Sequence, residues 1–426
     1  MKRHLFSELR TIYETTAFDP HTFRIAIKLK DVVDGAMLRR AVEQTMERYP
    51  YFRVRVSVEG GKVVFAENPA PVPVIQTDQR IVLGGGQTAG HLIAFCCWDN
   101  WLYIDAYHGL TDGGGIAPLI RTLLYYYCGA FFRDALSTDG VRLGDSAVSD
   151  EEWDDPAAHR ISAEHSLSAV KWDKPAYQIG ASGIAQITSD CIVHNIRIPE
   201  AEFMQFNLSN DGSPATIVAL LLARSIDALR GQEDNPAVIA MCVNQRRALR
   251  APLAHQSLVG DVRLPYTDRL RALPFSTQAT CFRGMVALQS DEDMVLEEIR
   301  QYQTLIAHLE TLDGHTARKA SCVSRMKALS GCITATVSYV GKANLGDLER
   351  YIQEYAALPS TALPSTHVPL TIEMSAVNGY FFLNFIQYFR EPAFFRAFIR
   401  QLRDKHIDYD ILNSAEALYP GVELPV

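Results

Sequence analysis

The feature that most constrains the fold of this chain is a strand pattern followed at once by a helix pattern, which occurs in both halves. In the first half, residues 22–31 (TFRIAIKLKD) alternate apolar side chains with mostly basic ones, which is typical of a strand with one buried face. Residues 35–49 then repeat apolar side chains at helical spacing, between Asp34 as a capping residue and Pro50 as a stop. This succession predicts an α/β fold.

The second half shows the same succession. Residues 191–198 (CIVHNIRI) are strand-like, and residues 213–231 have a helix pattern that Ser213 can cap. Residues 237–244 (AVIAMCVN) are strand-like again. We therefore expect a second α/β unit.

The segment between the two units is different in composition. Residues 136–160 are acidic, polar and rich in turn-forming residues, which indicates a linker or a crossover. We therefore expect an N-terminal half over residues 1–175 and a C-terminal half over residues 176–426.

Composition excludes several classes of protein. The chain has 426 residues, 48% of them hydrophobic, and can bury a core large enough for two domains. Its 41 Lys and Arg residues against 49 Asp and Glu give a formal charge of -8 without a basic block, which argues against a nucleic-acid partner. The eight dispersed cysteines form no CxxC pair, so we expect neither disulfides nor a metal site. The absence of a long uncharged apolar run, and the polar character of the first ten residues, predict no membrane span, no export and a cytoplasmic location.

The most informative short motif is AYHGLTDGGG at residues 106–115. It ends a predicted hairpin, so His108 lies where strand becomes loop. A helix pattern follows over residues 114–129, with Gly129 expected just past its end. Asp112 is therefore predicted in the strand-to-helix turn.

The residue types in this motif are those of a general base and a second residue that holds it in place. An imidazole has an ordinary pKa of about 6.5 and can accept a proton at neutral pH. An aspartate folded beneath the turn either orients the ring of His108 or holds the turn, and if buried it needs a cation. The glycines 113–115 permit a positive φ and a close backbone approach. The spacing alone also arises by chance, so an ordinary strand-ending loop is the alternative interpretation.

A dinucleotide-binding interpretation fails. Residues 84–89 (GGGQTA) fit G-x-G-x-x-A in form, but such a site needs a helix next, and the strand-like HLIAFCCW follows instead. We therefore expect no bound cofactor.

Further segments flank the histidine motif in a fixed order. Residues 23–56 precede it, and VNQRR at 243–247, TVSYVGKANLGDLERYI at 336–352 and VNGYFFLNFIQYF at 377–389 follow it. Together they resemble the condensation-domain and chloramphenicol-acetyltransferase superfamily, and within it the stand-alone alcohol acetyltransferase and polyketide-associated acyltransferase branch. The resemblance covers nearly the whole chain, and the HxxxDG element is its most specific part.

The resemblance implies two similar chloramphenicol-acetyltransferase-like halves, with mixed sheets, helices and a central tunnel at their interface. It implies an acyltransferase that moves an acyl group from a thioester directly to a small alcohol or amine acceptor. The co-substrate would be acyl-CoA or the phosphopantetheine thioester of an acyl carrier protein. A free-standing monomer is expected, because in single-chain relatives the second half supplies the surface that trimeric relatives obtain from a neighbour.

Residue roles follow from the same resemblance. His108 matches the general base that deprotonates the acceptor. Asp112 matches the aspartate that pairs with an arginine and fixes the turn, and Arg246 is the expected partner, with Arg247 as the fallback. Gly113 is assigned to close backbone approach.

Ser338 is the candidate donor to the oxyanion of the tetrahedral intermediate. The alternative for Ser338 is a strand serine bonded to a neighbouring backbone group.

At two places the sequence differs from motifs found in parts of the superfamily, and these differences limit the reactions that we expect. Tyr107 stands where peptide-forming condensation domains usually carry a first histidine, which favours ester or simple amide formation. The DFGWG element of plant hydroxyl acyltransferases is absent. A second class of function stays open, namely a catalytically inactive binding or scaffold protein that docks a carrier protein.

Overall fold

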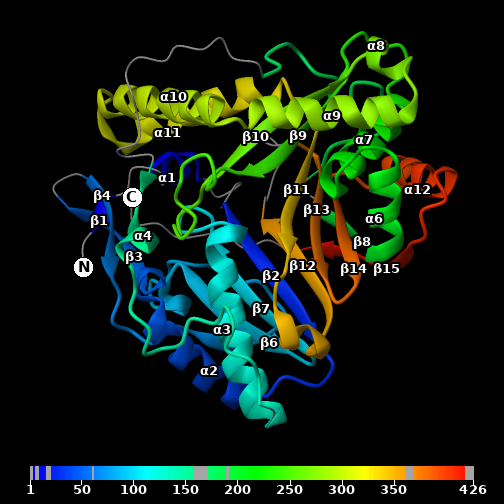
Figure 1. Cartoon of the computed structure of the whole chain (residues 1–426). Helices are drawn as coiled ribbons and strands as arrows, with labels where there is room; N and C mark the ends of the chain where they lie inside the picture. Colours follow the sequence, from blue (N-terminus) through cyan, green and yellow to red (C-terminus); the bar gives the residue numbers. More distant parts are fainter. Residues whose placement is uncertain are drawn as a thin grey trace.

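The computed structural model of the chain describes residues 3–4, 9–15, 21–59, 62–133, 135–156, 171–188, 191–360 and 368–417. These residues form a mixed α/β fold, as the sequence predicts, with two large sheets and helices packed on their faces (Figure 1). Among them, no helix is long and apolar enough to cross a membrane.

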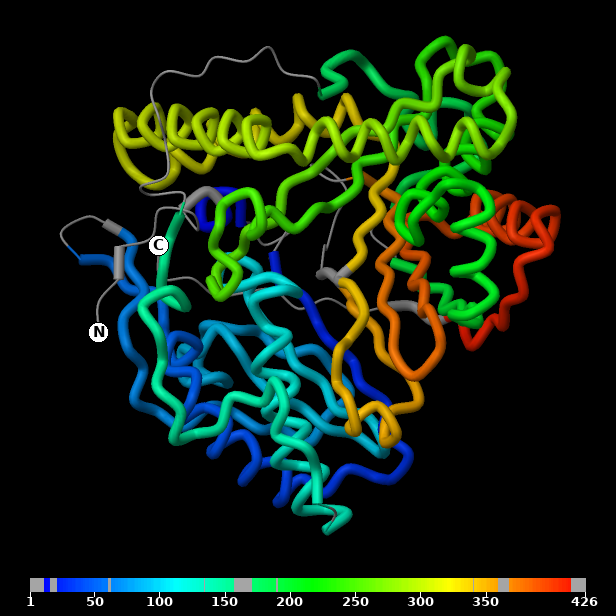
Figure 2. Tube along the Cα trace, viewed as in Figure 1, coloured from blue at the N-terminus to red at the C-terminus, as the bar shows by residue number. Residues whose placement is uncertain are grey.

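The first large sheet has five strands. In spatial order these are β12 (Ile352–Ser360), β2 (Thr22–Leu29), β7 (Trp101–Tyr107), β6 (Ile93–Trp98) and β5 (Val74–Gln76). The edge strand β12 comes from far along the chain and pairs antiparallel with β2 (Figure 2). The C-terminal part of the chain therefore completes the sheet of the N-terminal part, and the expected boundary near residue 175 stays a prediction.

The prediction that β2 buries only one face is wrong. Arg24, on the supposedly exposed face, is buried and forms an ion pair with Asp105 of β7 at 2.6 Å. Its guanidinium also donates to the carbonyls of Asp78 and Gln79, at 2.6 and 2.8 Å, because the loop before β6 covers this face. Burial of both faces holds the strand rigidly beside β7.

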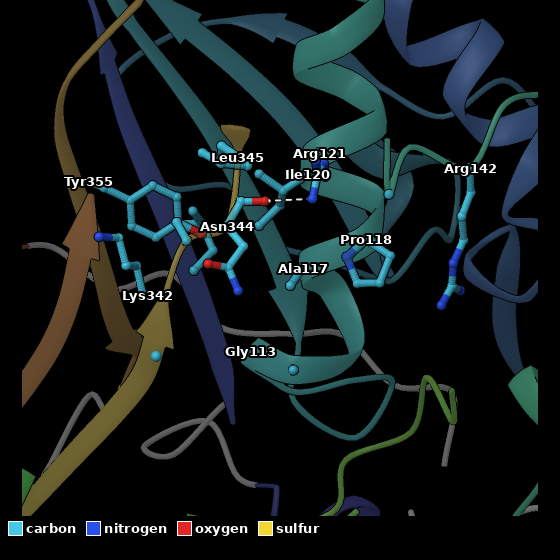
Figure 3. Close-up of a pocket in the computed structure, with 15 residues that line it drawn as sticks. Gly113, Ala117, Pro118, Ile120, Arg121, Arg142, Lys342, Asn344, Leu345 and Tyr355 are labelled. Atoms are coloured by element: carbon cyan, nitrogen blue, oxygen red, sulfur yellow. Dashed lines mark hydrogen bonds between the residues drawn. The ribbon is translucent and has the colours of Figure 1, made fainter. Parts of the chain in front are cut away.

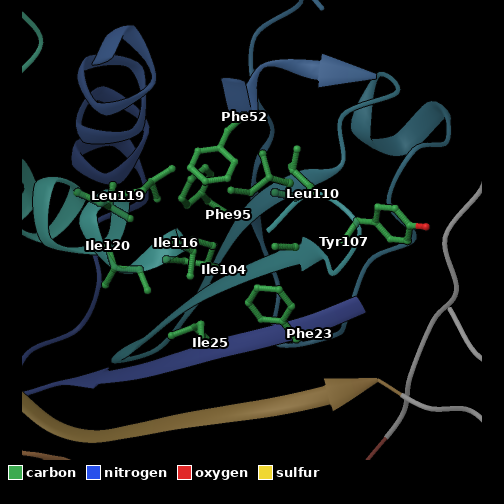
Figure 4. Close-up of a cluster of buried hydrophobic side chains, with 14 of the residues drawn as sticks. Phe23, Ile25, Phe52, Phe95, Ile104, Tyr107, Leu110, Ile116, Leu119 and Ile120 are labelled. Carbon is green, nitrogen blue, oxygen red and sulfur yellow. The ribbon is translucent and has the colours of Figure 1, made fainter. Parts of the chain in front are cut away.

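Two helices pack on the first sheet and enclose its apolar core (Figure 4). Helix α2 (Gly35–Arg48) begins after Asp34, whose carboxylate accepts from the N–H groups of Ala36 and Met37 as the sequence predicts. Helix α3 (Gly113–Phe132) begins after Asp112. It continues past Gly129, contrary to the expected end there, and stops at Arg133, which adopts the left-handed conformation with a φ of 56°.

The second large sheet has seven strands. In spatial order these are β10 (Val259–Tyr266), β9 (Ala237–Asn244), β11 (Ala335–Lys342), β13 (Leu370–Val377), β14 (Tyr380–Gln387), β8 (Cys191–Pro199) and β15 (Asp410–Ala417). The β9–β11 and β11–β13 pairs are parallel and the other pairs are antiparallel.

The two faces of this sheet differ in polarity. Helices α6 (Glu200–Ser209), α7 (Pro214–Asp227), α9 (Phe275–Gln289) and α12 (Ala393–Asp404) pack with its apolar face in a second core (Figure 1). The strand register gives the other face a row of polar residues, namely Asp261, Cys242, Ser338, Glu373, Asn384 and Asn195. This polar face meets β12, because Asn384 and Ser375 donate to the carbonyls of Ala357 and Tyr355.

The remaining elements surround these two sheets. Strands β1 (Arg3–His4), β4 (Lys62–Glu67) and β3 (Val54–Glu59) form a small sheet. Helices α10 (Glu292–Glu310) and α11 (Gly314–Ser330) lie side by side and contact α1 (Leu9–Glu14). The short elements are η1 (Pro50–Phe52), η2 (Gly86–Thr88), α4 (Asp150–Trp153), α8 (Asp268–Arg271) and η3 (Gly346–Tyr351).

Candidate active site

His108 lies directly after β7, at the junction between the two large sheets. Its backbone N–H donates to the carbonyl of His21 at 2.6 Å, which fixes the end of the strand. His108 is half-buried, and its ring lies edge-on to the ring of Phe23, with 5.3 Å between the ring centroids. Its Nδ1 lies 3.3 Å from Oγ of Ser257, which comes from the segment before β10. The imidazole is therefore held by residues from both parts of the chain.

Asp112 is the N-cap of α3 and is almost completely buried, with 1% exposure. Its Oδ1 accepts from the N–H of Gly115 at 2.8 Å, and its Oδ2 accepts from the N–H of Leu258 at 2.8 Å. Arg246 donates to both oxygens, at 2.8 and 3.0 Å, in a two-pronged ion pair. The carboxylate thus ties the turn after His108 to the segment before β10.

Arg246 is itself fixed by the polypeptide backbone. Its Nε donates to the carbonyl of Ala254 at 3.0 Å, and its Nη2 donates to that of Gln256 at 2.6 Å. The fallback partner, Arg247, is exposed and does not take this place. A guanidinium with this many fixed acceptors is a rigid support for the carboxylate of Asp112.

Two of the glycines after Asp112, Gly114 and Gly115, lie so close to neighbouring atoms that a side chain would not fit. A Cβ at Gly114 would lie 2.7 Å from Nη1 of Arg246, and one at Gly115 would lie 2.1 Å from the carbonyl oxygen of His255. The positive φ that these glycines permit is not used, because residues 113–115 form the first turn of α3 and none of the three is among the positive-φ residues of the described chain. The backbone packing around the ion pair therefore excludes side chains here.

The two sheets enclose a cavity of about 150 Å³ beside His108. The N-terminal part contributes Phe23, Ile25, His108, Asp112, Gly113 and Gly114. The seven-stranded sheet and the strand β12 contribute Cys242, Val243, Asn244, Val259, Ser338, Tyr339, Glu373, Ala357 and Leu358, and Arg246 completes the lining. Of the residues predicted from the sequence, His108, Asp112, Gly113, Arg246 and Ser338 therefore meet at one cavity.

A second cavity of about 280 Å³ adjoins the first at the start of α3 (Figure 3). Both cavities are lined by Ile25, Gly113 and Gly114. The second one lies between α3 and the segment after β11, and Figure 3 shows Ala117 and Pro118 on the helix side and Lys342 and Asn344 on the other. Arg121, Arg142 and Lys342 give this cavity three cationic lining residues.

Ser338 and Glu373 lie next to each other in the polar row of the seven-stranded sheet. The Ser338 hydroxyl is close enough to the side chains of Glu373 and Cys242 to lower the pKa of each. These side-chain partners differ from the backbone partner considered in the sequence analysis. Burial raises the pKa of the Glu373 carboxyl to about 7, and the hydrogen bond from Ser338 only partly offsets that rise. Burial likewise raises the pKa of the Cys242 thiol to about 12, with the negative charge of Glu373 as a further cause.

Two residues of this site, Ser257 and Glu373, were not predicted from the sequence. Ser257 follows β9 in an irregular segment, and no periodicity or motif marks it. Glu373 did carry a signal, because it is the one charged residue in the central strand LTIEMSAV. An isolated charge in a central strand needs a partner or a ligand, so the sequence could have indicated Glu373 as a candidate site residue.

The raised pKa of Glu373 has a measurable effect on stability. Between its ordinary value of 4.5 and about 7, the folded protein keeps a proton that the unfolded chain has released. Stability from this group is therefore present at low pH and is lost as the pH rises through 7. We expect Glu373→Gln, which does not titrate, to gain roughly 3 kcal/mol in free energy of unfolding relative to the natural protein between pH 4 and pH 8. Urea unfolding at several pH values measures this difference.

Asp261→Asn is the matched control for this measurement. It removes one negative charge from the same row, but Asp261 is partly exposed and lies 3.4 Å from Arg263 and 3.8 Å from Lys171. A general effect of net charge would appear in both variants. A stability difference for Glu373→Gln that does not change with pH would contradict the expectation.

Comparison with known proteins identifies the fold. No family model matches the sequence, and no curated protein matches it. The structure is similar to that of polyketide synthase associated protein 5 from Mycobacterium tuberculosis, with a TM-score of 0.60, 14% identity, and 94% of this chain and 96% of that chain covered. It is also similar to F. sporotrichioides TRI101 complexed with coenzyme A and T-2, with a TM-score of 0.58, 10% identity, and 97% and 100% covered.

A third similar structure is the epimerization domain from the third module of tyrocidine synthetase B, with a TM-score of 0.58, 10% identity, and 95% and 96% covered. The chain therefore has the fold that these proteins share, as the resemblance in sequence predicted. At 10–14% identity the likeness establishes the fold alone.

Among the described residues, no group of three or more His, Cys, Asp or Glu side chains is arranged to hold a metal ion.

Proposed function

We propose that this protein is an acyltransferase that moves an acyl group from a thioester directly to a hydroxyl or amine acceptor, with His108 as the general base. The observation that carries the proposal is the placement of the His108 ring at a cavity between the two large sheets, on a turn fixed by the buried Asp112–Arg246 pair. A rigidly held imidazole at a cavity is the arrangement that proton abstraction from an acceptor needs.

The proton path follows from the contact with Ser257. When the Ser257 Oγ accepts the Nδ1 proton of His108, the imidazole lone pair is on Nε2. Nε2 takes the proton of the acceptor, whose oxygen or nitrogen attacks the thioester carbonyl. The tetrahedral intermediate then collapses, the carbon–sulfur bond breaks, and the imidazolium returns its proton to the leaving thiolate. Asp112 takes no part in these transfers and acts as a positioning residue.

The negative oxygen of the intermediate needs a hydrogen-bond donor. Ser338 lines the same cavity as His108, so its hydroxyl is the donor that we propose. That hydroxyl contacts the carboxyl of Glu373, so its availability depends on what else Glu373 binds.

The second cavity suits the phosphate-bearing part of the donor. Arg142 and Lys342 form ion pairs with Glu152 and Glu200, at 2.7 and 2.8 Å. Arg121 donates to the carbonyl of Asn344 at 2.8 Å and forms no ion pair with a carboxylate among the described residues (Figure 3). Its positive charge is therefore available to a phosphate of coenzyme A or phosphopantetheine. The single chain supplies both cavities, so the proposed activity needs no second copy.

Acceptor-dependent thiol release tests the proposed function. We expect the purified protein to release coenzyme A from acyl-CoA only when an alcohol or amine is added, because attack is direct. We expect the KM for acyl-CoA to be about tenfold lower than that for the acyl N-acetylcysteamine thioester, which has the same reacting group but no phosphates. Thiol release and product mass measure both quantities over a panel of acceptors.

The variant Arg121→Gln tests the lower KM for acyl-CoA separately from the acyl transfer itself. It should raise the KM for acyl-CoA toward that of the N-acetylcysteamine thioester and leave the KM of the latter unchanged. No acceptor-dependent turnover with any donor would contradict the proposed activity and favour the alternative, a binding protein that docks a carrier protein.

A further inference from the structure

Among the described residues, Glu373 differs from three other deeply buried carboxylates, Asp105, Asp112 and Glu152. It is 9% exposed and lies on the central strand β13. Asp105, Asp112 and Glu152, which are buried to a similar or greater degree, each form an ion pair with an arginine. Among the described residues, Glu373 has no ion pair with a cation, and its partner in the strand register is the uncharged Ser338. A carboxylate this deeply buried, with no cation beside it, is stabilised by a partner that supplies charge and donors.

The fold places this carboxyl group where a ligand can reach it. Glu373 and His108 line the same cavity, one from the seven-stranded sheet and the other from the end of β7. A volume of about 150 Å³ corresponds to roughly five water molecules. A small acceptor that binds with its nucleophile at His108 therefore has its other end in the same cavity, where Glu373 can contact it.

We infer that Glu373 binds an ammonium group of the acceptor, so that the acceptor is an amino alcohol or a diamine with its nucleophile at His108. The ammonium group is a compact cation with three N–H donors, and it supplies both the charge and the donors that the carboxylate lacks. A methyl group at the same place would leave the carboxylate desolvated and unpaired. The identity of the nucleophile rests on the proposed function, whereas the binding of the ammonium group does not.

The neighbouring residues fit this assignment. Ser338 and Cys242, which line the cavity beside Glu373, are small and uncharged. Among the described lining residues, neither of these neighbours therefore competes with a ligand cation for Glu373. Arg246, the cationic lining residue, is fully engaged with Asp112 and with backbone carbonyls. Once an ammonium group donates to Glu373, the Ser338 hydroxyl can donate to the oxyanion instead. Binding of the correct acceptor then completes the site that stabilises the intermediate.

A pair of ligands of equal size tests the inference. 5-Amino-1-pentanol and 1-hexanol have the same number of heavy atoms and differ by an ammonium group in place of a methyl group. Calorimetric titration at pH 8 of the full chain should give a Kd for 5-amino-1-pentanol about tenfold or more below that for 1-hexanol, because hydrogen bonds to a charged group are stronger. Glu373→Gln should reduce this preference to about twofold or less.

Asp261→Asn is again the matched control, because it removes the same charge from the same row outside the cavity lining and should keep the preference. Equal affinity of the natural protein for both ligands, no binding of either ligand, or an unchanged preference in Glu373→Gln would overturn the inference. The comparison of the two ligands on the natural protein decides the question even if a variant fails to fold. Because no thioester is present, a failure of the proposed acyl transfer would show in the thiol-release assay and leave this titration interpretable.

Discussion

His108→Ala lowers kcat for acyl transfer by about 10²–10⁴-fold, because the acceptor then loses its proton without a positioned base. The protein should stay folded, since His108 is only half-buried and its contacts include an edge contact with Phe23 and a polar contact with Ser257. The Asp112–Arg246 pair, which fixes the turn, does not involve the imidazole. Steady-state rates and thermal unfolding of the variant measure the two effects separately.

Two further variants give the controls for this result. His308→Ala removes an exposed histidine from α10 and should leave kcat unchanged. Ser257→Ala should lower kcat less than His108→Ala does, and should shift the pH profile of kcat/KM, because the Nδ1 proton loses its acceptor. Full activity of His108→Ala would contradict the role of the imidazole and, with it, the proposed mechanism.

The local parts of the fold could be predicted because each one has a periodicity or a cap of its own. Strand β2 and helix α2, and strand β8 and helix α7, form in the segments where they were expected, with Asp34 as the cap of α2. The placement of β12 beside β2 could not be predicted, because pairing between distant strands is decided by tertiary packing. Burial of Arg24 has the same origin, since a loop far along the sequence covers that face.

In the candidate site too, the local residues could be predicted from the sequence and the residues from distant strands could not. The turn that contains His108 and Asp112 is a local structure, and its residue types together with the family resemblance predicted a base with a supporting aspartate. Ser257 and Glu373 join the site through the second sheet, where only the register of neighbouring strands brings Glu373 beside Ser338. Residues that meet across distant strands leave no spacing in the sequence, so the structure was needed to find them.

Asp112→Ala is expected to lower the free energy of unfolding by about 3–5 kcal/mol, because it leaves the buried Arg246 guanidinium without its counter-charge. It also removes the N-cap of α3 and the acceptor for the N–H of Leu258. The turn that positions His108 loses both anchors, so kcat should fall together with stability. Arg246→Ala should have a loss of similar size, since it leaves the carboxylate buried at 1% exposure. Urea unfolding and steady-state kinetics of each variant measure these losses.

The double variant Asp112→Ala/Arg246→Ala distinguishes an ion pair from two independent contacts. Because neither charge is then left unpaired, its loss of stability should be smaller than the sum of the two single losses. Arg247→Ala, which removes the neighbouring exposed arginine, should change neither stability nor rate and is the control for loss of a positive charge. Strictly additive losses would mean that the two side chains stabilise the fold separately. The position of the turn after His108 would then be fixed by the packing of the glycines against Arg246 and His255 instead.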